Sequence, residues 1–165
     1  MPDAWIYRLS EAEIAEIEAA TAGIQARGLD IMHITRADCP LPKFGAVLAD
    51  IREELIDGRG FAMIRGLDLD RLTKPQYAAA FWGVGTYLGE ALCQNRNGHM
   101  LGHVKDIGEE YGEARGYMTR AHMALHCDQC DFLALACFHN AKTGGNHLIC
   151  SSVALYNEIL RRRPD

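Results

Sequence analysis

The sequence predicts a single domain of the α+β class, and three observations lead to this prediction. The chain has 165 residues, its first half carries apolar residues at helical spacing, and its second half carries short apolar runs separated by turn residues. A chain of this length suits one domain. Helices that precede strands along the sequence are typical of α+β folds. No internal repeat or low-complexity segment interrupts the pattern.

The first predicted helix follows Ser10. Ser10 and Glu13 have the spacing of a capping box, in which each side chain bonds the backbone N–H of the other residue. Gly28 is expected to end this helix. Its apolar face is formed by Ile14, Ile17, Ala20, Thr21 and Ile24. Residues 29–34 are then expected to form a short strand, and the proline-containing residues 38–42 form a linker too short to separate two domains.

Two further helices and a strand are predicted next. One helix covers residues 43–56 and is followed by Gly58 in the left-handed conformation. The other begins after Thr73, with Pro75 in its first turn, and a buried strand over residues 61–64 lies between them. The apolar positions of the two helices are Val47, Leu48, Ile51 and Leu55, then Tyr77, Phe81, Trp82, Val84 and Leu88. The later helix also contains glycines that would permit close packing on a sheet, namely Gly83, Gly85 and Gly89.

Beyond Ala91 the apolar runs become short and strand-like. Strands are predicted over residues 101–104, 132–138 and 147–150. The run 132–138 is apolar throughout, which suits a strand buried on both faces. The acidic, glycine-rich residues 107–116 predict a mobile surface loop, and residues 142–145 predict a turn. A last helix is capped by Ser151 or Ser152 and stops at Pro164.

Composition and charge argue against several classes of protein. The formal net charge is −5, the pI is about 5.8 and no basic stripe is present, so nucleic-acid binding lacks electrostatic support. No apolar run is long enough to span a bilayer, and the N-terminus lacks the pattern of a signal peptide, so we expect a cytoplasmic location. The 6 cysteines are scattered and are expected to be free thiols in a reducing compartment.

The strongest candidate site is the pair His126 and Asp128, within residues 123–131. On an extended strand, residues i and i+2 lie about 6–7 Å apart on one face, so the imidazole and the carboxylate project together. Such a pair supplies two of the ligands of a 2-His-1-carboxylate triad, which holds Fe(II) and leaves coordination positions open. The alternative interpretation is a buried His–Asp hydrogen-bonded pair with no metal.

Several other stretches occur in a fixed order around this pair. They are residues 57–67 (DGRGFAMIRGL), the Gln94–Asn95 region, residues 101–106 (LGHVKD), 115–117 (RGY), 140–152 (NAKTGGNHLICSS) and 152–160. In order and spacing, the chain from about Leu41 onward resembles the TauD/TfdA family of Fe(II)- and 2-oxoglutarate-dependent dioxygenases.

The resemblance implies a fold and a domain boundary. It implies N-terminal helices followed by the first strands of a double-stranded β-helix, a jelly roll of the clavaminate synthase-like type. That core needs about eight strands in two sheets, and too few strands follow Asp128 to complete it. The family's second metal-binding His and its carboxylate-binding Arg are expected beyond Asp165. Residues 1–165 are therefore expected to form a single TauD/TfdA-like dioxygenase domain that is truncated on its C-terminal side and incomplete in this chain.

The resemblance also implies an activity. We expect an oxidoreductase that oxidises or hydroxylates a small polar organic substrate with O2 and releases succinate and CO2. His126, Asp128 and a later His would hold Fe(II), with 2-oxoglutarate as co-substrate. His147 stands where the family usually has the Thr or Ser that contacts 2-oxoglutarate, so it is the candidate cofactor-binding residue. Gln94 and Asn95 are candidates for substrate binding, or they close a turn.

Other functions remain open. The chain can be a non-catalytic, truncated or degenerate member of this family. Cys127 and Cys130 form a CxxC that, with a nearby His, would make a zinc-binding module, although zinc needs a second pair of ligands at suitable spacing. As packing residues they would be ordinary buried thiols, and Cys127 would point away from the face of His126 and Asp128. The expected partners are a small-molecule substrate and O2, with no nucleic acid and no membrane. Association into a homo-oligomer is left open.

Overall fold

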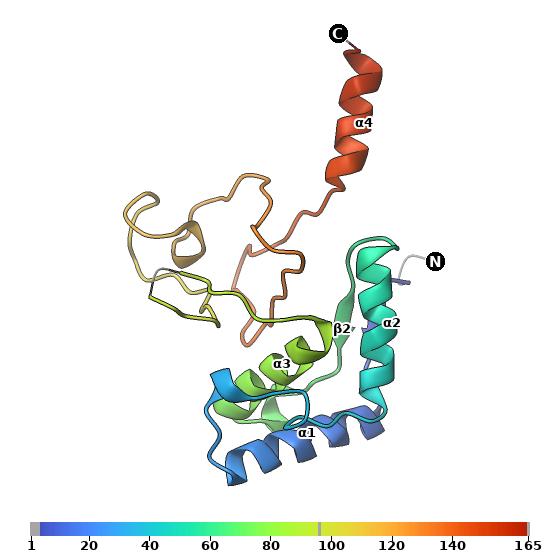
Figure 1. Ribbon diagram of the computed structural model, residues 1–165. Coiled ribbons are helices and arrows are strands. Elements are labelled where there is room, and N and C mark those ends of the chain that lie inside the picture. The colour runs from blue at the N-terminus through green and yellow to red at the C-terminus, as the bar shows by residue number, and fades with distance from the viewer. Residues whose placement is uncertain (1–3, 96, 165) are drawn as a thin grey trace.

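A computed structural model of the chain describes residues 4–95 and 97–164. In chain order its elements are β1 (Ile6–Arg8), α1 (Glu11–Ala26), the short 3-10 helix η1 (Ile31–His33), α2 (Phe44–Ile56), β2 (Met63–Arg65), η2 (Leu69–Arg71), α3 (Lys74–Leu88), η3 (Gly116–Met118) and α4 (Ser152–Arg162). Figure 1 shows α1, α2 and α3 gathered at one end, irregular chain beyond α3, and α4 projecting away from both.

The arrangement agrees with the predicted α+β class. β1 and β2 form a two-stranded parallel sheet in which Tyr7 is paired with Ile64. These are the only strands among the described residues, so the predicted strands of the jelly roll are not seen there. The core lies where the helices meet, and it contains Ile17, Ala20, Ile24, Ile34, Cys39, Leu41, Phe44, Leu48, Ile51, Leu72, Ala79 and Ala80.

All the helices begin close to the residues that the sequence predicts. The capping box of α1 is present, because Ser10 accepts from Glu13 N while the Glu13 carboxylate accepts from Ser10 N. Thr73 and Gln76 form a second capping box at α3, and Ser151 caps α4. The predicted apolar face of α1 is buried at each of its positions, namely Ile14, Ile17, Ala20, Thr21 and Ile24.

A buried carboxylate joins β1 to α1. Glu13 is only 5% exposed, and its Oε1 accepts a 2.6 Å hydrogen bond from the Tyr7 hydroxyl. Its Oε2 accepts from both the backbone N and the Oγ of Ser10 at 2.7 Å. Burial raises the pKa of Glu13, but the bonds from Tyr7 and Ser10 outweigh burial and hold this pKa below its usual value. The bond to Glu13, together with burial, raises the pKa of Tyr7 to about 12.

The predicted linker is part of the core. Cys39 and Leu41 are 1% and 2% exposed, so residues 38–42 do not separate two units. The Tyr87 hydroxyl of α3 donates to the Cys39 carbonyl at 2.9 Å and accepts from Leu41 N at 2.8 Å. Trp82 Nε1 donates to the Ile34 carbonyl at 3.0 Å. Polar tips of two α3 aromatics therefore bond the backbone of the segment between η1 and α2, and Tyr87 bonds the buried loop itself.

Gly83 lets α3 approach the buried loop closely. A Cβ placed on Gly83 would lie 3.0 Å from Cys39 Cβ and would overlap Cys39 Sγ. Gly85 lies two residues further along α3, and a Cβ placed on it would meet no atom within 4 Å. The prediction that helix glycines permit close packing is therefore right for Gly83, but the packing partner is a loop and not a sheet.

Two local predictions before β2 are wrong. Residues 29–34 contain the 3-10 helix η1 instead of a strand, because the Asp30 side chain accepts from Met32 N and caps it. The left-handed glycine after α2 is Gly60, with φ of +81°, and not Gly58. Gly58 is needed for a different reason, since a Cβ there would lie 2.7 Å from the Glu54 carbonyl oxygen.

The predicted strands differ most from the structure. β2 is exposed along its length, whereas the strand over residues 61–64 was expected to be buried. The runs 101–104, 132–138 and 147–150 form no strands, and no backbone–backbone hydrogen bond is made by any described residue in 120–150. A strand needs a paired neighbour, and none lies beside these runs within the part of the chain that the structure describes. Residues 107–116 contain an isolated bridge between Tyr111 and Ala114, and η3 begins at Gly116.

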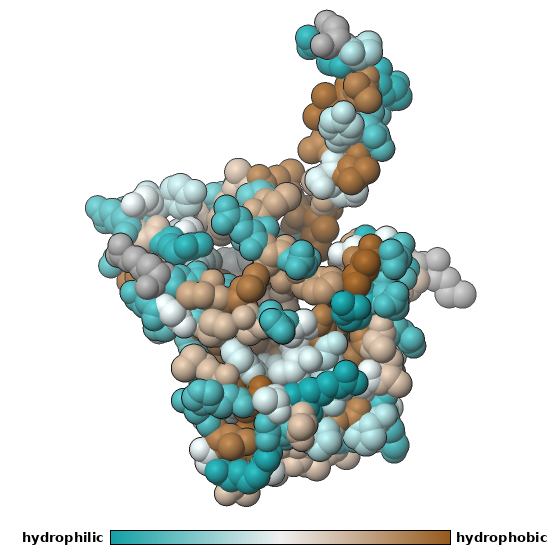
Figure 2. Space-filling model, in the orientation of Figure 1, coloured by the Kyte–Doolittle hydropathy of each residue, from teal (hydrophilic) through white to brown (hydrophobic). Residues whose placement is uncertain are grey.

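The end of the described chain is again as predicted. The chain bends at residues 142–143, and Gly144 and Gly145 follow with φ of +76° and +72°, in the region of the predicted turn. α4 follows with apolar side chains exposed on its surface, as Figure 2 shows, namely Val153, Leu155, Tyr156, Ile159 and Leu160. Among the described helices none is both long and apolar enough to cross a membrane.

The buried carboxylate gives a testable prediction. Glu13→Gln removes the charged acceptor of three hydrogen bonds, so we expect the free energy of unfolding to fall by about 1–3 kcal/mol at pH 7. Because the folded pKa of Glu13 is lowered, its contribution is complete above the unfolded value of 4.5 and is lost as pH falls through the folded value. Denaturant titrations at neutral and acid pH measure this. The exposed Glu53→Gln on α2 is the control, and an equal loss in both variants would contradict the prediction.

A second prediction compares two glycines of one helix. Gly83→Ala should lower the free energy of unfolding by about 1–3 kcal/mol, because its methyl group overlaps Cys39. Gly85→Ala meets no atom within 4 Å and should raise it by about 0.5–1 kcal/mol through helix propensity. Thermal or urea unfolding of the two variants separates packing from propensity. Equal stabilisation by both substitutions would show that α3 does not press on the loop.

Candidate metal centre

The structure brings His126 and Asp128 together. His126 Nε2 lies 4.0 Å from Asp128 Oδ1, and the two side chains are 48% and 46% exposed. Adjacent ligands of a metal ion with bonds of about 2.1 Å lie about 3 Å apart. A modest side-chain rotation would therefore bring both atoms to one ion. The pair is open to solvent, so the interpretation as a buried, metal-free His–Asp bond is not supported by this geometry.

The other nitrogen of His126 is already engaged. Nδ1 lies 2.7 Å from the carbonyl oxygen of Ala124. A carbonyl oxygen only accepts, so Nδ1 carries the proton in this bond and the lone pair of the neutral ring is on Nε2. A backbone carbonyl on the second nitrogen is a common way to orient a metal-binding imidazole. The lone pair therefore belongs to the nitrogen that faces Asp128.

The donor set fits part of an iron site. Imidazole nitrogen and carboxylate oxygen suit Fe(II) in a 2-His-1-carboxylate arrangement. Among residues 4–95 and 97–164, no group of three or more His, Cys, Asp or Glu side chains is close enough to hold a metal ion. His126 and Asp128 can thus act as two ligands, and a third is not found among the described residues.

The cysteines beside the pair are not part of such a cluster either. Cys127 is exposed and Cys130 is partly buried, and both are free thiols. Burial raises the pKa of the Cys130 thiol, and the carboxylates of Asp128 and Asp131 raise it further. The four-ligand zinc site of the alternative hypothesis is therefore not assembled among the described residues.

Asn95 closes a turn. Its side-chain oxygen accepts from Asn97 N at 3.0 Å and from His99 N at 3.3 Å, and its amide nitrogen lies 3.0 Å from His99 Nδ1. The backbone N of Gln94 donates to the His99 carbonyl across the same turn, while the Gln94 amide bonds the Leu92 carbonyl. Of the two interpretations of this pair, the structure shows the turn, and substrate binding remains a proposal.

His147 forms no metal-binding cluster with the pair among the described residues. Its side chain is exposed, and among the described residues it makes no hydrogen bond or ion pair. The structure therefore does not bring His147 into a cluster with His126 and Asp128, and its role with 2-oxoglutarate remains a proposal.

Sequence reasoning missed the contacts that attach this region to the helices. The Tyr77 hydroxyl of α3 donates to the Cys137 carbonyl at 3.1 Å, and the rings of Tyr77 and Phe138 lie 5.6 Å apart. Lys74 Nζ lies 5.9 Å from the Phe138 ring centre. The N-terminal half of α3 therefore anchors the run 132–138, which follows the candidate ligands. Tyr77 was predicted to lie on the apolar face of this helix. Its hydroxyl group is the one feature in the sequence that could have indicated a hydrogen bond here.

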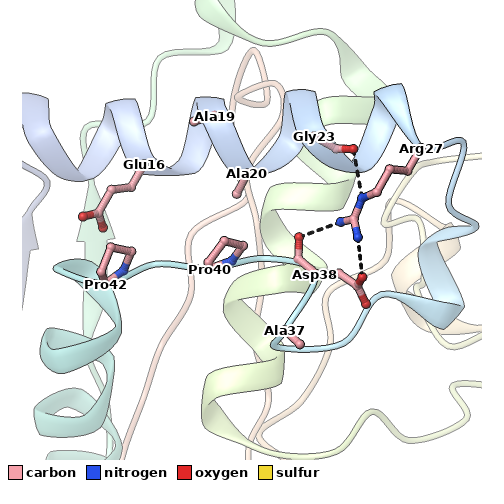
Figure 3. A pocket seen from close by; sticks show the side chains of 9 residues that line it. All are labelled: Glu16, Ala19, Ala20, Gly23, Arg27, Ala37, Asp38, Pro40 and Pro42. Atoms are coloured by element: carbon pink, nitrogen blue, oxygen red, sulfur yellow. Dashed lines mark hydrogen bonds and ion pairs between the residues drawn. The ribbon is translucent and has the colours of Figure 1, made fainter.

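A shallow groove elsewhere has a structural explanation. It lies between α1 and residues 37–42, has a volume of about 570 Å³, and contains none of the candidate site residues (Figure 3). At one end Arg27 and Asp38 form a 2.7 Å ion pair. At the other, the Glu16 carboxylate accepts from the backbone N of Lys43 and Phe44 at the start of α2. Its charged groups are thus engaged in holding the fold.

An imidazole nitrogen and a carboxylate oxygen lying together are donors of the kind that a mononuclear metal site with nitrogen and oxygen ligands uses. The chain belongs to the TauD/TfdA family, since the family model "Taurine catabolism dioxygenase TauD, TfdA family" matches residues 18–165. The resemblance seen in the sequence is confirmed, and the family implies a jelly-roll fold.

Two relatives agree with this membership. The protein named FR-33289 synthase from Streptomyces rubellomurinus is 34% identical over 164 residues, covering 98% of this chain and 48% of that protein. The taurine hydroxylase-like protein SAT17 from Stachybotrys chartarum is 31% identical over 170 residues, covering 98% of this chain and 44% of that protein. The chain spans about half the length of these curated relatives. The family is one of oxygenases and hydroxylases.

Proposed function

We propose that the protein is an Fe(II)- and 2-oxoglutarate-dependent dioxygenase that hydroxylates or otherwise oxidises a small polar organic substrate. The observation that carries the proposal is the placement of His126 Nε2 4.0 Å from Asp128 Oδ1, inside a chain that belongs to the TauD/TfdA family. The name of one relative includes a hydroxylase, which supports the reaction type. Residues 1–165 are proposed to belong to one dioxygenase domain of the clavaminate synthase-like type.

Bound iron would supply the activation of O2 coupled to oxidation of 2-oxoglutarate to succinate and CO2. The chain's own residues would orient and position. The Ala124 carbonyl holds the proton of His126 on Nδ1 and leaves Nε2 as the ligand atom. Asp128 supplies an anionic oxygen on the same side. Because both side chains are about half exposed, the described surface leaves room for small molecules to approach.

The co-substrate and substrate roles rest on the family pattern. We propose that His147 donates a hydrogen bond to the 2-oxoglutarate carboxylate, where an imidazole replaces the usual hydroxyl. We propose Gln94 and Asn95 near the substrate on the family pattern alone, because the bonds of Asn95 to Asn97 and His99 support the alternative role in a turn. The proposed activity is that of the whole protein, because this chain covers about half of its relatives.

The metal ligands are tested by substitution. His126→Ala and Asp128→Ala should each weaken Fe(II) binding at least about tenfold and abolish succinate release, because each removes a ligand atom. Binding is measured anaerobically by titration, and succinate by its release with 2-oxoglutarate and O2. His122→Ala and Asp131→Asn change the same residue types in the same segment and should keep both properties. Wild-type Fe(II) affinity in either ligand variant would show that the assignment is wrong.

The zinc alternative is tested separately. The double variant Cys127→Ser, Cys130→Ser should keep the metal content of the reduced protein within a few-fold of wild type, because no thiol-containing metal cluster is assembled among the described residues. Metal content is measured by elemental analysis after purification under reducing conditions. Loss of one equivalent of zinc in this variant would favour the zinc-binding module over the dioxygenase.

A further inference from the structure

The apolar run that follows the candidate ligands is attached to α3 at both ends. Near the start of the helix, the Tyr77 hydroxyl donates to the Cys137 carbonyl at 3.1 Å, and its ring lies 5.6 Å from that of Phe138. At the other end, the ring of Phe132 lies against the C-cap residue Gly89, because a Cβ placed there would be 3.9 Å from Phe132 Cδ2. The run therefore passes along α3 in the direction opposite to the helix.

The lengths of the two segments fit this arrangement. Residues 132–137 contain no bend, so the chain between Phe132 and Phe138 is close to extended and spans about 20 Å. From Tyr77 to Gly89 an α-helix rises about 18 Å. Because the two lengths agree, a nearly straight run makes both attachments at once.

The side chains of the run divide between two faces. Phe132 and Phe138 are six residues apart, which places them on the same face of an extended chain, and both are partly buried. Leu133 and Leu135 belong to the other face and are 58% and 56% exposed. The two phenylalanine rings are therefore the large side chains that the run turns toward α3, and Leu133 is a neighbour of Phe132 that turns away from it.

The segment that carries the candidate ligands has few attachments of its own. Among the described residues, no hydrogen bond or ion pair joins residues 121–131 to α1, α2 or α3. Ahead of the ligands, Met123 packs on η3, since a Cβ placed on Gly116 would lie 3.3 Å from Met123 Sδ. Phe132 follows Asp128 by four residues, which even fully extended chain spans in about 14 Å. Of the contacts with α3 given above, the one at Phe132 is therefore nearest to the ligands along the chain.

We propose that Phe132 is a positioning residue for the candidate metal centre. Its ring, seated against Gly89 at the end of α3, limits where Asp128 can lie relative to the helices, while Tyr77 holds the far end of the run. The inference rests on the proposed function for its effect on the metal, but the attachment of the run to α3 does not.

The effect on the metal is one of preorganisation. Metal binding to a loosely held segment loses affinity because the segment must be ordered as the metal binds. An attachment that already restricts the chain four residues from Asp128 removes part of that loss before the metal arrives. Releasing the ring of Phe132 should therefore weaken metal binding about five- to tenfold, although the side chain does not touch the metal.

The first measurement is the affinity for Mn(II), which accepts oxygen and nitrogen ligands and is followed by electron paramagnetic resonance. Phe132→Ala should bind Mn(II) about five- to tenfold more weakly than wild type. Phe132→Leu keeps an apolar group against Gly89 and should recover affinity to within about twofold of wild type. Leu133→Ala removes an exposed side chain from the adjacent position and should also stay within about twofold.

A second measurement needs no metal. Cys130 is partly buried and Cys127 is exposed, so their rates of alkylation by iodoacetamide report how open the segment is. Phe132→Ala should speed alkylation of Cys130 at least about threefold relative to Cys127, whereas Leu133→Ala should leave this ratio unchanged. Peptide mass spectrometry separates the two thiols. Thermal unfolding should be nearly the same in all these variants, because Phe132 and Leu133 are not part of the core.

The outcomes separate the two proposals. Wild-type Mn(II) affinity in Phe132→Ala, an equal loss in Leu133→Ala, or no recovery in Phe132→Leu would overturn the positioning role while leaving the dioxygenase proposal standing. Absence of Mn(II) binding in the wild-type protein would overturn the metal site, and with it the effect of Phe132 on the metal. In that case an unchanged ratio of alkylation rates in Phe132→Ala would also overturn the attachment of the segment through this ring.

Discussion

The contact between α3 and the buried loop at Cys39 is the constraint on which the rest of the structure depends. Gly83 allows this approach, and the Tyr87 hydroxyl closes it by bonding the loop backbone on both sides of Pro40. α3 is also the element that bonds the irregular half of the chain, through Tyr77 and Cys137. The packing of α3 on this loop therefore positions Tyr77, which bonds the chain that follows the candidate metal centre. Neither His126 nor Asp128 belongs to the core.

The candidate centre itself is weakly constrained, and this shapes its chemistry. Within residues 4–95 and 97–164, the only hydrogen bond that orients a candidate ligand is the one from His126 Nδ1 to the Ala124 carbonyl, two residues away. Metal binding to such a segment must also order it, so part of the binding free energy is used in folding the site.

Local signals predicted the helices well, and non-local signals predicted the strands poorly. Ser10 with Glu13, and Thr73 with Pro75, specify helix starts within four residues, so these predictions do not depend on distant parts of the chain. Residues 132–138 are apolar enough for a buried strand, but pairing depends on a neighbour that the run does not encode. Residues 29–34 have a strand-like pattern, but the Asp30 side chain caps the 3-10 helix η1 there. For the site, the i, i+2 spacing of His126 and Asp128 predicted that the two side chains project together, and they lie 4.0 Å apart, while their role as metal ligands stays a prediction. Tyr77 was noticed only as an apolar residue.

The alternation of side chains along an extended backbone separates two kinds of chemistry in one short motif. His126 and Asp128 offer nitrogen and oxygen donors on one side, while Cys127, between them, projects to the other. A single ion cannot use all three neighbours, so the motif is a poor start for a sulfur-rich zinc site and a good one for a metal that accepts imidazole and carboxylate.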